Sequence, residues 1–201
     1  GMFIPIFEKN GFIMELDRYM WEHVCMLLHR WIEEGRDPAP ISVNMSRVSM
    51  YSHRTVSFLT ELVRKYEVPS QLLHLELTES AYMEDPGAMK RRLTQLKEQG
   101  FMIMMDDFGS AYSSLNTLRE LPFDYLKVDR EFLGSVGQDT RSRIVLASVV
   151  QMASLLDMTV IVEGVETEEQ RDYVASIGCD FIQGYYYAKP MPVEMYETYI
   201  L

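Results

Sequence analysis

Short apolar runs in this sequence end on carboxylate, amide or amine side chains, the groups that hold metal ions and move protons. Asp106 and Asp107 close one such run, and Glu163 and Glu166 follow another. Carboxylates that are brought together repel one another and raise each other's pKa unless a positive charge lies among them. These positions therefore predict a charged site, whose full candidate set is Asn44, Glu76, Glu79, Asp106, Asp107, Lys127, Asp129, Glu163, Glu166 and Gln183.

The cation that balances these acids is predicted to be a metal. Lys127 is the basic side chain at the run ends, and one ammonium group is too little charge for so many carboxylates. One or two divalent ions would supply the rest. Oxygen and amide ligands without histidine or cysteine favour Mg²⁺ or Mn²⁺ over Zn²⁺.

Each candidate also has an ordinary structural explanation. Asn44 could cap a turn, Glu76 could form a salt bridge, and Asp106 with Asp107 could cap the next helix. For any one residue, the structural explanation is preferred. The set as a whole favours a functional site, because most of the predicted strands end on a polar group that a purely structural strand would not require.

The elements that must position these residues alternate between strand and helix. The apolar runs predict strands at 41–44, 72–78, 101–106, 125–128, 159–163 and 180–183. Helical spacing of apolar residues predicts helices at about 15–34, 54–66, 87–99, 113–118, 141–156 and 168–177. This alternation predicts an α/β fold with a parallel sheet, either closed as a (β/α) barrel or open and doubly wound. Both gather strand C-termini at one face or edge.

Composition limits the function classes. A chain of 201 residues with 47% hydrophobic content is expected to form a single domain over residues 1–201. Its formal charge of −11 argues against binding a DNA or RNA polymer. No apolar run approaches the length of a membrane span, so membrane contact is not expected and a cytoplasmic location is predicted. Cys25 and Cys179 are expected to be reduced core residues.

Several strings resemble, in order, the signatures of the EAL (Glu-Ala-Leu) family of cyclic di-GMP phosphodiesterases. They extend over essentially the whole chain: FIPIFEKNG at 3–11, SVNMS at 42–46, LELTES at 75–80, DDFGSAYSSL at 106–115, LKVDREF at 126–132, VEGVET at 162–167 and GCDFIQGYYYAKPMP at 178–192. The resemblance implies a TIM-like (β/α) barrel. It also implies hydrolysis of cyclic di-GMP to linear pGpG with Mg²⁺ or Mn²⁺.

The resemblance assigns metal-binding roles to five positions. Asn44, Glu76 and Asp106 match the ligands of one metal ion. Asp106 and Asp107 match the pair that holds a second ion. Glu163 matches a residue that is either a metal ligand or the base for the attacking water.

The remaining matched positions support the reaction. Lys127 and Gln183 match residues that position the attacking water, and Glu79 matches a glutamate that steadies the loop after Asp107. Asp129 and Glu166 match further positions that line the site. A lysine beside carboxylates keeps its proton, so Lys127 is expected to orient water or stabilise charge rather than act as the base.

The family's Glu-Ala-Leu segment, with a metal-ligand glutamate and a phosphate-binding arginine, would lie upstream of Phe3 and outside this chain. By the family pattern, the chain is expected to hold about six of the eight barrel strands. Two alternatives to an active enzyme remain open: a catalytically impaired cyclic di-GMP receptor, and a regulatory fragment that pairs through an open sheet edge. The resemblance also implies a homodimer, and sensory or GGDEF domains in a longer parent protein.

Overall fold

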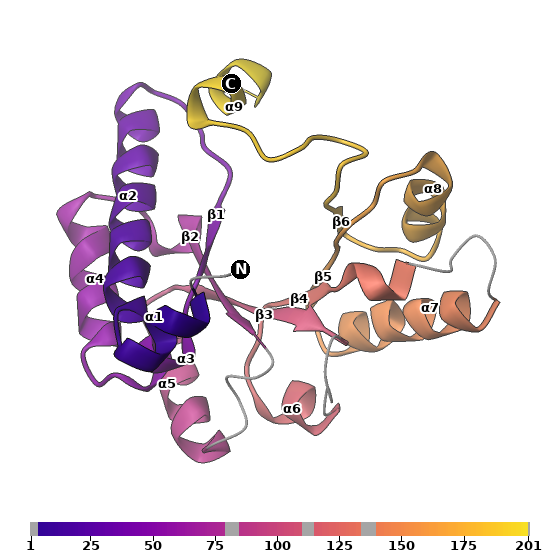
Figure 1. Ribbon diagram of the computed structural model, residues 1–201, viewed down its shortest axis with the longest axis horizontal. Coiled ribbons are helices and arrows are strands. Elements are labelled where there is room, and N and C mark those ends of the chain that lie inside the picture. Colours follow the sequence, from indigo (N-terminus) through magenta and orange to yellow (C-terminus); the bar gives the residue numbers. More distant parts are fainter. Residues whose placement is uncertain (1–3, 79–84, 110–114, 134–139, 201) are drawn as a thin grey trace. The chain divides into compact units, whose positions relative to one another are not determined.

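The computed structural model describes residues 4–78, 85–109, 115–133 and 140–200. Within them, six strands join into one sheet in the order β1-β2-β3-β4-β5-β6 (Figure 1). The chain divides into two compact units, the first formed by residues 1–106 and 111–125 and the second by residues 107–110 and 126–201. Glu79 lies outside the described residues.

The first unit is built on three parallel strands. β1 (Ile41–Asn44) pairs with β2 (Leu73–Thr78), and β2 pairs with β3 (Met102–Phe108), whose last two residues belong to the second unit. The helical elements of this unit are α1 (Ile4–Asn10), α2 (Ile13–Glu33), α3 (Arg47–Tyr51), α4 (Thr55–Lys65), the 3-10 turn η1 (Ser70–Leu72), α5 (Pro86–Glu98) and α6 (Leu115–Glu120).

The core of the first unit lies between its strands and the long helix α2. Trp21, Cys25 and Leu28 recur at helical spacing on α2 and are buried, and the helix packs against β1 and α4. In β2, Leu73, Leu75 and Leu77 are fully buried and the alternate residues His74 and Glu76 are buried as well. A strand covered on both faces is typical of a parallel sheet between layers of helices.

The second unit continues the alternation of strand and helix. Its elements are β4 (Tyr125–Val128, of which Tyr125 belongs to the first unit), the 3-10 turn η3 (Arg130–Leu133), α7 (Thr140–Leu155), β5 (Thr159–Val162), α8 (Glu168–Ser176), β6 (Phe181–Ile182) and α9 (Val193–Ile200). β5 and β6 are parallel, and α7 packs against β5. A capping box formed by Thr167 and Gln170 begins α8.

Each unit uses an aspartate to secure the start of a strand. In the first unit, the Oδ2 atom of Asp124 accepts a hydrogen bond from the Ile103 N–H at 2.9 Å. In the second unit, the Oδ2 atom of Asp180 accepts one from the Val160 N–H at 2.8 Å. Each aspartate directly precedes one strand and accepts its hydrogen bond from the N–H of another strand. The bond therefore aligns the beginnings of the two strands.

The predicted α/β fold is confirmed, and the strand order decides between the two architectures considered. A doubly wound sheet reverses its strand order at a switch point, whereas the strands here follow the sequence from β1 to β6. All six predicted strands are present, and β1 and β4 match their predicted bounds. The short helices α1, α3 and α9 were not predicted. In the described ranges, no helix has both the length and the apolar content to cross a membrane.

Candidate functional site

Three predicted metal ligands share one face of the sheet in the first unit. Asn44 is paired with Glu76 across β1 and β2, and Thr78 is paired with Asp106 across β2 and β3. Paired residues of parallel strands point to the same face, as do residues two apart on one strand. Asn44, Glu76 and Asp106 therefore face the same side near the C-terminal ends of their strands. Glu76 and Asp106 are 7% and 8% exposed.

Helix α2 holds the chain on both sides of the Asn44 side chain. The Nε1–H group of Trp21 donates a hydrogen bond to the Asn44 carbonyl at 3.0 Å. One turn earlier on α2, the Oδ2 atom of Asp17 accepts a hydrogen bond from the Ser46 N–H at 3.0 Å. Burial raises the pKa of Asp17, and hydrogen bonds from Ser46 and Ser49 partly oppose that rise. The backbone that presents Asn44 is thus anchored by two buried side chains.

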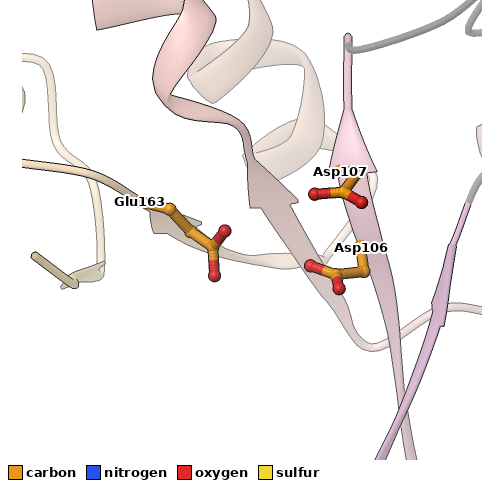
Figure 2. Close-up of side chains that lie close together, drawn as sticks. All are labelled: Asp106, Asp107 and Glu163. Atoms are coloured by element: carbon orange, nitrogen blue, oxygen red, sulfur yellow. The ribbon is translucent and has the colours of Figure 1, made fainter. Parts of the chain in front are cut away.

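Asp107 has a backbone conformation that strands rarely contain. Its φ is +56°, in the left-handed region that non-glycine residues avoid at a cost of about 1–3 kcal/mol. Consecutive side chains of a regular strand point to opposite faces, which would separate Asp106 from Asp107. The left-handed residue breaks this alternation, and both carboxylates then lie on the same side of the strand (Figure 2).

The carboxylates of Asp107 and Glu163 approach one another in the second unit. Each places an oxygen within 4.8 Å of the other (Figure 2). Opposite ligands of an octahedral Mg²⁺ ion lie about 4.2 Å apart. The donor set is all oxygen, which suits Mg²⁺ or Mn²⁺. These residues therefore fit a divalent metal ion.

Lys127 supplies a positive charge at this cluster. Its Nζ atom lies 2.8 Å from the Oε1 atom of Glu163, and the two side chains are only 7% and 19% exposed. β4 ends one residue after Lys127, and the Glu163 N–H donates to the Val128 carbonyl at 3.0 Å. The backbone bond places Glu163 beside the end of β4, where its carboxylate pairs with the Lys127 ammonium group.

Four predicted site residues line one cleft of about 310 Å³ in the second unit. They are Asp129, Glu163, Glu166 and Gln183. The Oδ1 atom of Asp129 accepts a hydrogen bond from the Glu131 N–H at 2.7 Å, so this carboxylate also secures the start of η3. The Gln183 N–H donates to the Val162 carbonyl at 2.9 Å, which holds Gln183 next to the end of β5.

Gly184 allows the close approach that shapes this cleft. A Cβ atom added at Gly184 would lie 2.1 Å from the Val165 carbonyl oxygen and 2.4 Å from its nitrogen. Contacts this short with backbone atoms leave room for a hydrogen atom only. The glycine therefore lets the chain after β6 pack directly on the loop that carries Glu163 and Glu166.

The structure places nine of the ten predicted site residues, and Glu79 alone lies outside the described ranges. In the first unit, Asn44, Glu76 and Asp106 share a face; in the second, Asp107, Lys127, Asp129, Glu163, Glu166 and Gln183 lie at strand ends or line the cleft. Sequence reasoning missed four contributors: Asp17, Trp21, Arg130 and Tyr185. The last two stand in the strings LKVDREF and GCDFIQGYYYAKPMP, so their positions next to candidate residues were the available signal.

Comparisons with known proteins identify similar sequences. The profile of the EAL domain family matches residues 1–190. The chain is 31% identical to the signaling protein YkoW of Bacillus subtilis over 100% of its length, and 32% identical to the bifunctional diguanylate cyclase/cyclic di-GMP phosphodiesterase MucR of Pseudomonas aeruginosa over 96%. It spans 25% and 28% of those two proteins.

A solved structure of the PaMucR phosphodiesterase in complex with c-di-GMP has the same fold. It matches with a TM-score of 0.91 at 32% identity, over 98% of this chain and 79% of the PaMucR chain. This likeness confirms the predicted TIM-like α/β fold, to which the chain contributes the six strands described above.

Proposed function

Because this chain belongs to the EAL domain family, we propose that it is the catalytic part of a cyclic di-GMP phosphodiesterase that forms linear pGpG. The observation that carries the proposal is the pair of carboxylates of Asp107 and Glu163 in the second unit, with Lys127 bonded to Glu163. Such a cluster at strand ends is costly unless it binds a cation, and oxygen ligands suit the ions that polarise phosphodiesters.

The proposed metal ligands are Asn44, Glu76, Asp106, Asp107 and Glu163, and the proposed ions are Mg²⁺ or Mn²⁺. A bound ion of this kind polarises the phosphodiester and lowers the pKa of a bound water. Asp106 and Asp107 can serve it together because the left-handed backbone at Asp107 brings both carboxylates to one side. Glu76 and Asp106 are held on buried strands, so little side-chain freedom would be lost on binding.

Protein side chains carry the proton in the proposed reaction. Water attacks the phosphorus atom, the P–O3′ bond breaks, and the 3′ oxygen leaves as a hydroxyl after taking up a proton from solvent. Glu163 accepts the proton of the attacking water and later returns it to solvent, and Lys127, at 2.8 Å, holds this carboxylate in position. Gln183, on the wall of the same cleft, offers amide donors and an acceptor that orient the water. Asp129 and Glu166 complete the cleft, and Glu79 is proposed to steady the loop after Asp107.

The domain organisation, oligomeric state and cellular location are also proposed from membership of the EAL domain family. We expect a single catalytic domain that forms a homodimer and works in the bacterial cytoplasm without binding the membrane itself. MucR is a bifunctional protein of which this chain matches 28%, which supports the proposal that sensory or GGDEF domains accompany the chain in a longer parent.

Hydrolysis of cyclic di-GMP by this chain with Mg²⁺ and with Mn²⁺, and Glu163→Gln as the control, tests the proposal. Formation of pGpG that needs the metal and falls by about a hundredfold or more in the variant is the expected result. Binding of cyclic di-GMP without turnover would instead establish a receptor. No binding and no turnover would contradict both functions.

A further inference from the structure

The end of β3, at residues 107–109 of the second unit, has an unfavourable backbone conformation. Asp107 and Gly109 have φ values of +56° and +98°, with Phe108 between them. Glycine adopts positive φ without steric cost, whereas an aspartate there is strained and persists only where the surrounding structure enforces it. The contacts that hold residues 107–109 therefore also decide where the Asp107 carboxylate lies.

The ring of Phe132 lies against these residues at two points. It stacks on the buried ring of Phe108, with the ring centres 6.4 Å apart and the ring planes at 12° to one another. It also fills the space that a side chain at position 109 would need, because a Cβ atom added at Gly109 would overlap the Cε2 and Cζ atoms of the ring. A glycine at position 109 thus allows both the positive φ and the close approach of the ring.

Phe132 is itself fixed by η3. Its N–H donates to the Asp129 carbonyl at 3.2 Å, the next residue, Leu133, is buried, and α7 packs against η3. The Asp129 N–H in turn donates to the Phe108 carbonyl at 3.4 Å, a distance beyond the usual range of such bonds. This weak backbone bond leaves much of the task of holding residues 107–109 to the ring of Phe132.

The conformation of Asp107 matters because its carboxylate approaches that of Glu163 (Figure 2). With a regular strand backbone, the Asp107 side chain would follow the alternation of β3 and point to the other face. We propose that Phe132 is a positioning residue for the metal site, which acts by keeping Asp107 in the left-handed conformation. The phenyl ring has no metal-binding atom, so it acts through Asp107. The inference rests on the proposed function, in which Asp107 is a metal ligand.

Urea unfolding in EDTA tests the backbone part of this inference. Glycine relieves the strain of a left-handed aspartate, so Asp107→Gly should raise the urea midpoint of the wild type. Phe132→Ala should let residues 107–109 relax, and in that background Asp107→Gly should raise the midpoint less than about half as much. Asp157→Gly is the matched control, because Asp157 has φ +57° outside β3 and η3 and should give the same gain in both backgrounds.

Calorimetric titration with Mn²⁺ tests the placement of the carboxylate. Phe132→Ala should raise the dissociation constant about tenfold or more, as is usual when a residue that orients a metal ligand is removed. Phe132→Leu keeps apolar bulk without the flat ring, should recover part of the affinity, and replaces the alanine variant in both tests if that variant does not fold. Val150→Ala, at a buried position of α7, should lower the urea midpoint and leave Mn²⁺ affinity unchanged.

The outcomes separate this inference from the proposed function. An undiminished gain from Asp107→Gly in the Phe132→Ala background would overturn the inference and leave the proposed function standing, and so would native Mn²⁺ affinity in Phe132→Ala. A wild type that binds no Mn²⁺ would overturn the proposed metal site, whereas urea unfolding would still decide whether the ring holds Asp107. A lost gain together with weakened Mn²⁺ binding would establish Phe132 as a positioning residue.

Discussion

At the scale of single residues, the site depends on charged side chains that compensate one another. Lys127 and Glu163 form a buried ion pair, and Glu163 also approaches Asp107. Removing one partner of a buried pair leaves an uncompensated charge, which costs more than the pair itself contributes. The pair therefore has a stability signature that can be measured without metal or substrate.

Lys127→Met should destabilise the metal-free protein by about 2–4 kcal/mol, because Glu163 then keeps its charge among other carboxylates. Adding Glu163→Gln to that variant should restore about 1–3 kcal/mol of the loss. Urea unfolding in EDTA of the wild type, both single variants and the double variant gives this coupling energy. The exposed pair of Lys65 and Glu22, at 2.7 Å, is the matched control and should couple far more weakly. Equal coupling in the two pairs would contradict the account of Lys127.

Asp107 combines a strained backbone with a charge in the cluster. Asp107→Gly should abolish hydrolysis of cyclic di-GMP and yet stabilise the metal-free protein, because it relieves the positive φ and removes one repelling carboxylate. Asp157 has φ +57° at an exposed position after α7, so Asp157→Gly measures the backbone part alone. We expect Asp107→Gly to raise the free energy of unfolding, measured in EDTA, by about 1 kcal/mol more than Asp157→Gly does. If Asp107→Gly raised the free energy of unfolding less than Asp157→Gly does, the carboxylate of Asp107 would not be repelled by its neighbours.

At the scale of elements, the alternation of apolar runs with segments of helical spacing predicted the architecture better than any single residue. Strands 41–44 and 125–128 have clear bounds in the sequence, and both were predicted to the residue. The helix α3, at Arg47–Tyr51, was missed because five residues are too few to show helical periodicity.

The parts of the site that escaped prediction depend on tertiary packing. Trp21 reaches Asn44 from 23 residues away, and its apolar spacing on α2 predicts only a core residue. The positive φ of Asp107 has no signature in an Asp-Asp pair, since aspartate is also compatible with regular strands. Arg130 lies in an exposed turn, and the cleft it lines exists only because separate segments meet there.

The anchoring of β1 by α2 gives a prediction at this scale. Trp21→Phe removes the hydrogen bond to the Asn44 carbonyl while it keeps most of the buried ring, and should weaken Mn²⁺ binding about tenfold. Trp31→Phe is the control, because Trp31 is a buried tryptophan of the same helix at 2% exposure. Calorimetric titration with Mn²⁺ gives both affinities. In an Asn44→Ala background, Trp21→Phe should change the affinity for Mn²⁺ little further. If it weakened Mn²⁺ binding there as strongly as in the wild type, Trp21 would not act through Asn44.

At the scale of the whole molecule, charge sets the balance between folding and function. A net charge of −11 repels itself in the folded state, and the carboxylates of the candidate site concentrate part of that charge in one place. Any salt reduces general repulsion by screening, whereas only a cation that fits the cluster binds there. The two effects differ in their concentration dependence and can therefore be separated.

Mn²⁺ and Mg²⁺ should raise the midpoint of thermal unfolding at millimolar concentrations, because an ion that binds only the folded state stabilises it by mass action. At a hundred times the dissociation constant this amounts to about 2.7 kcal/mol. NaCl at matched ionic strength should give a much smaller rise, and EDTA should reverse the effect of the metals. Asp107→Asn keeps a side chain that tolerates positive φ but removes the ligand charge, so its metal-dependent rise should largely disappear. If NaCl matched the divalent ions, or if Asp107→Asn responded as strongly as the wild type, the cations would act by screening alone and the cluster would not be a metal site.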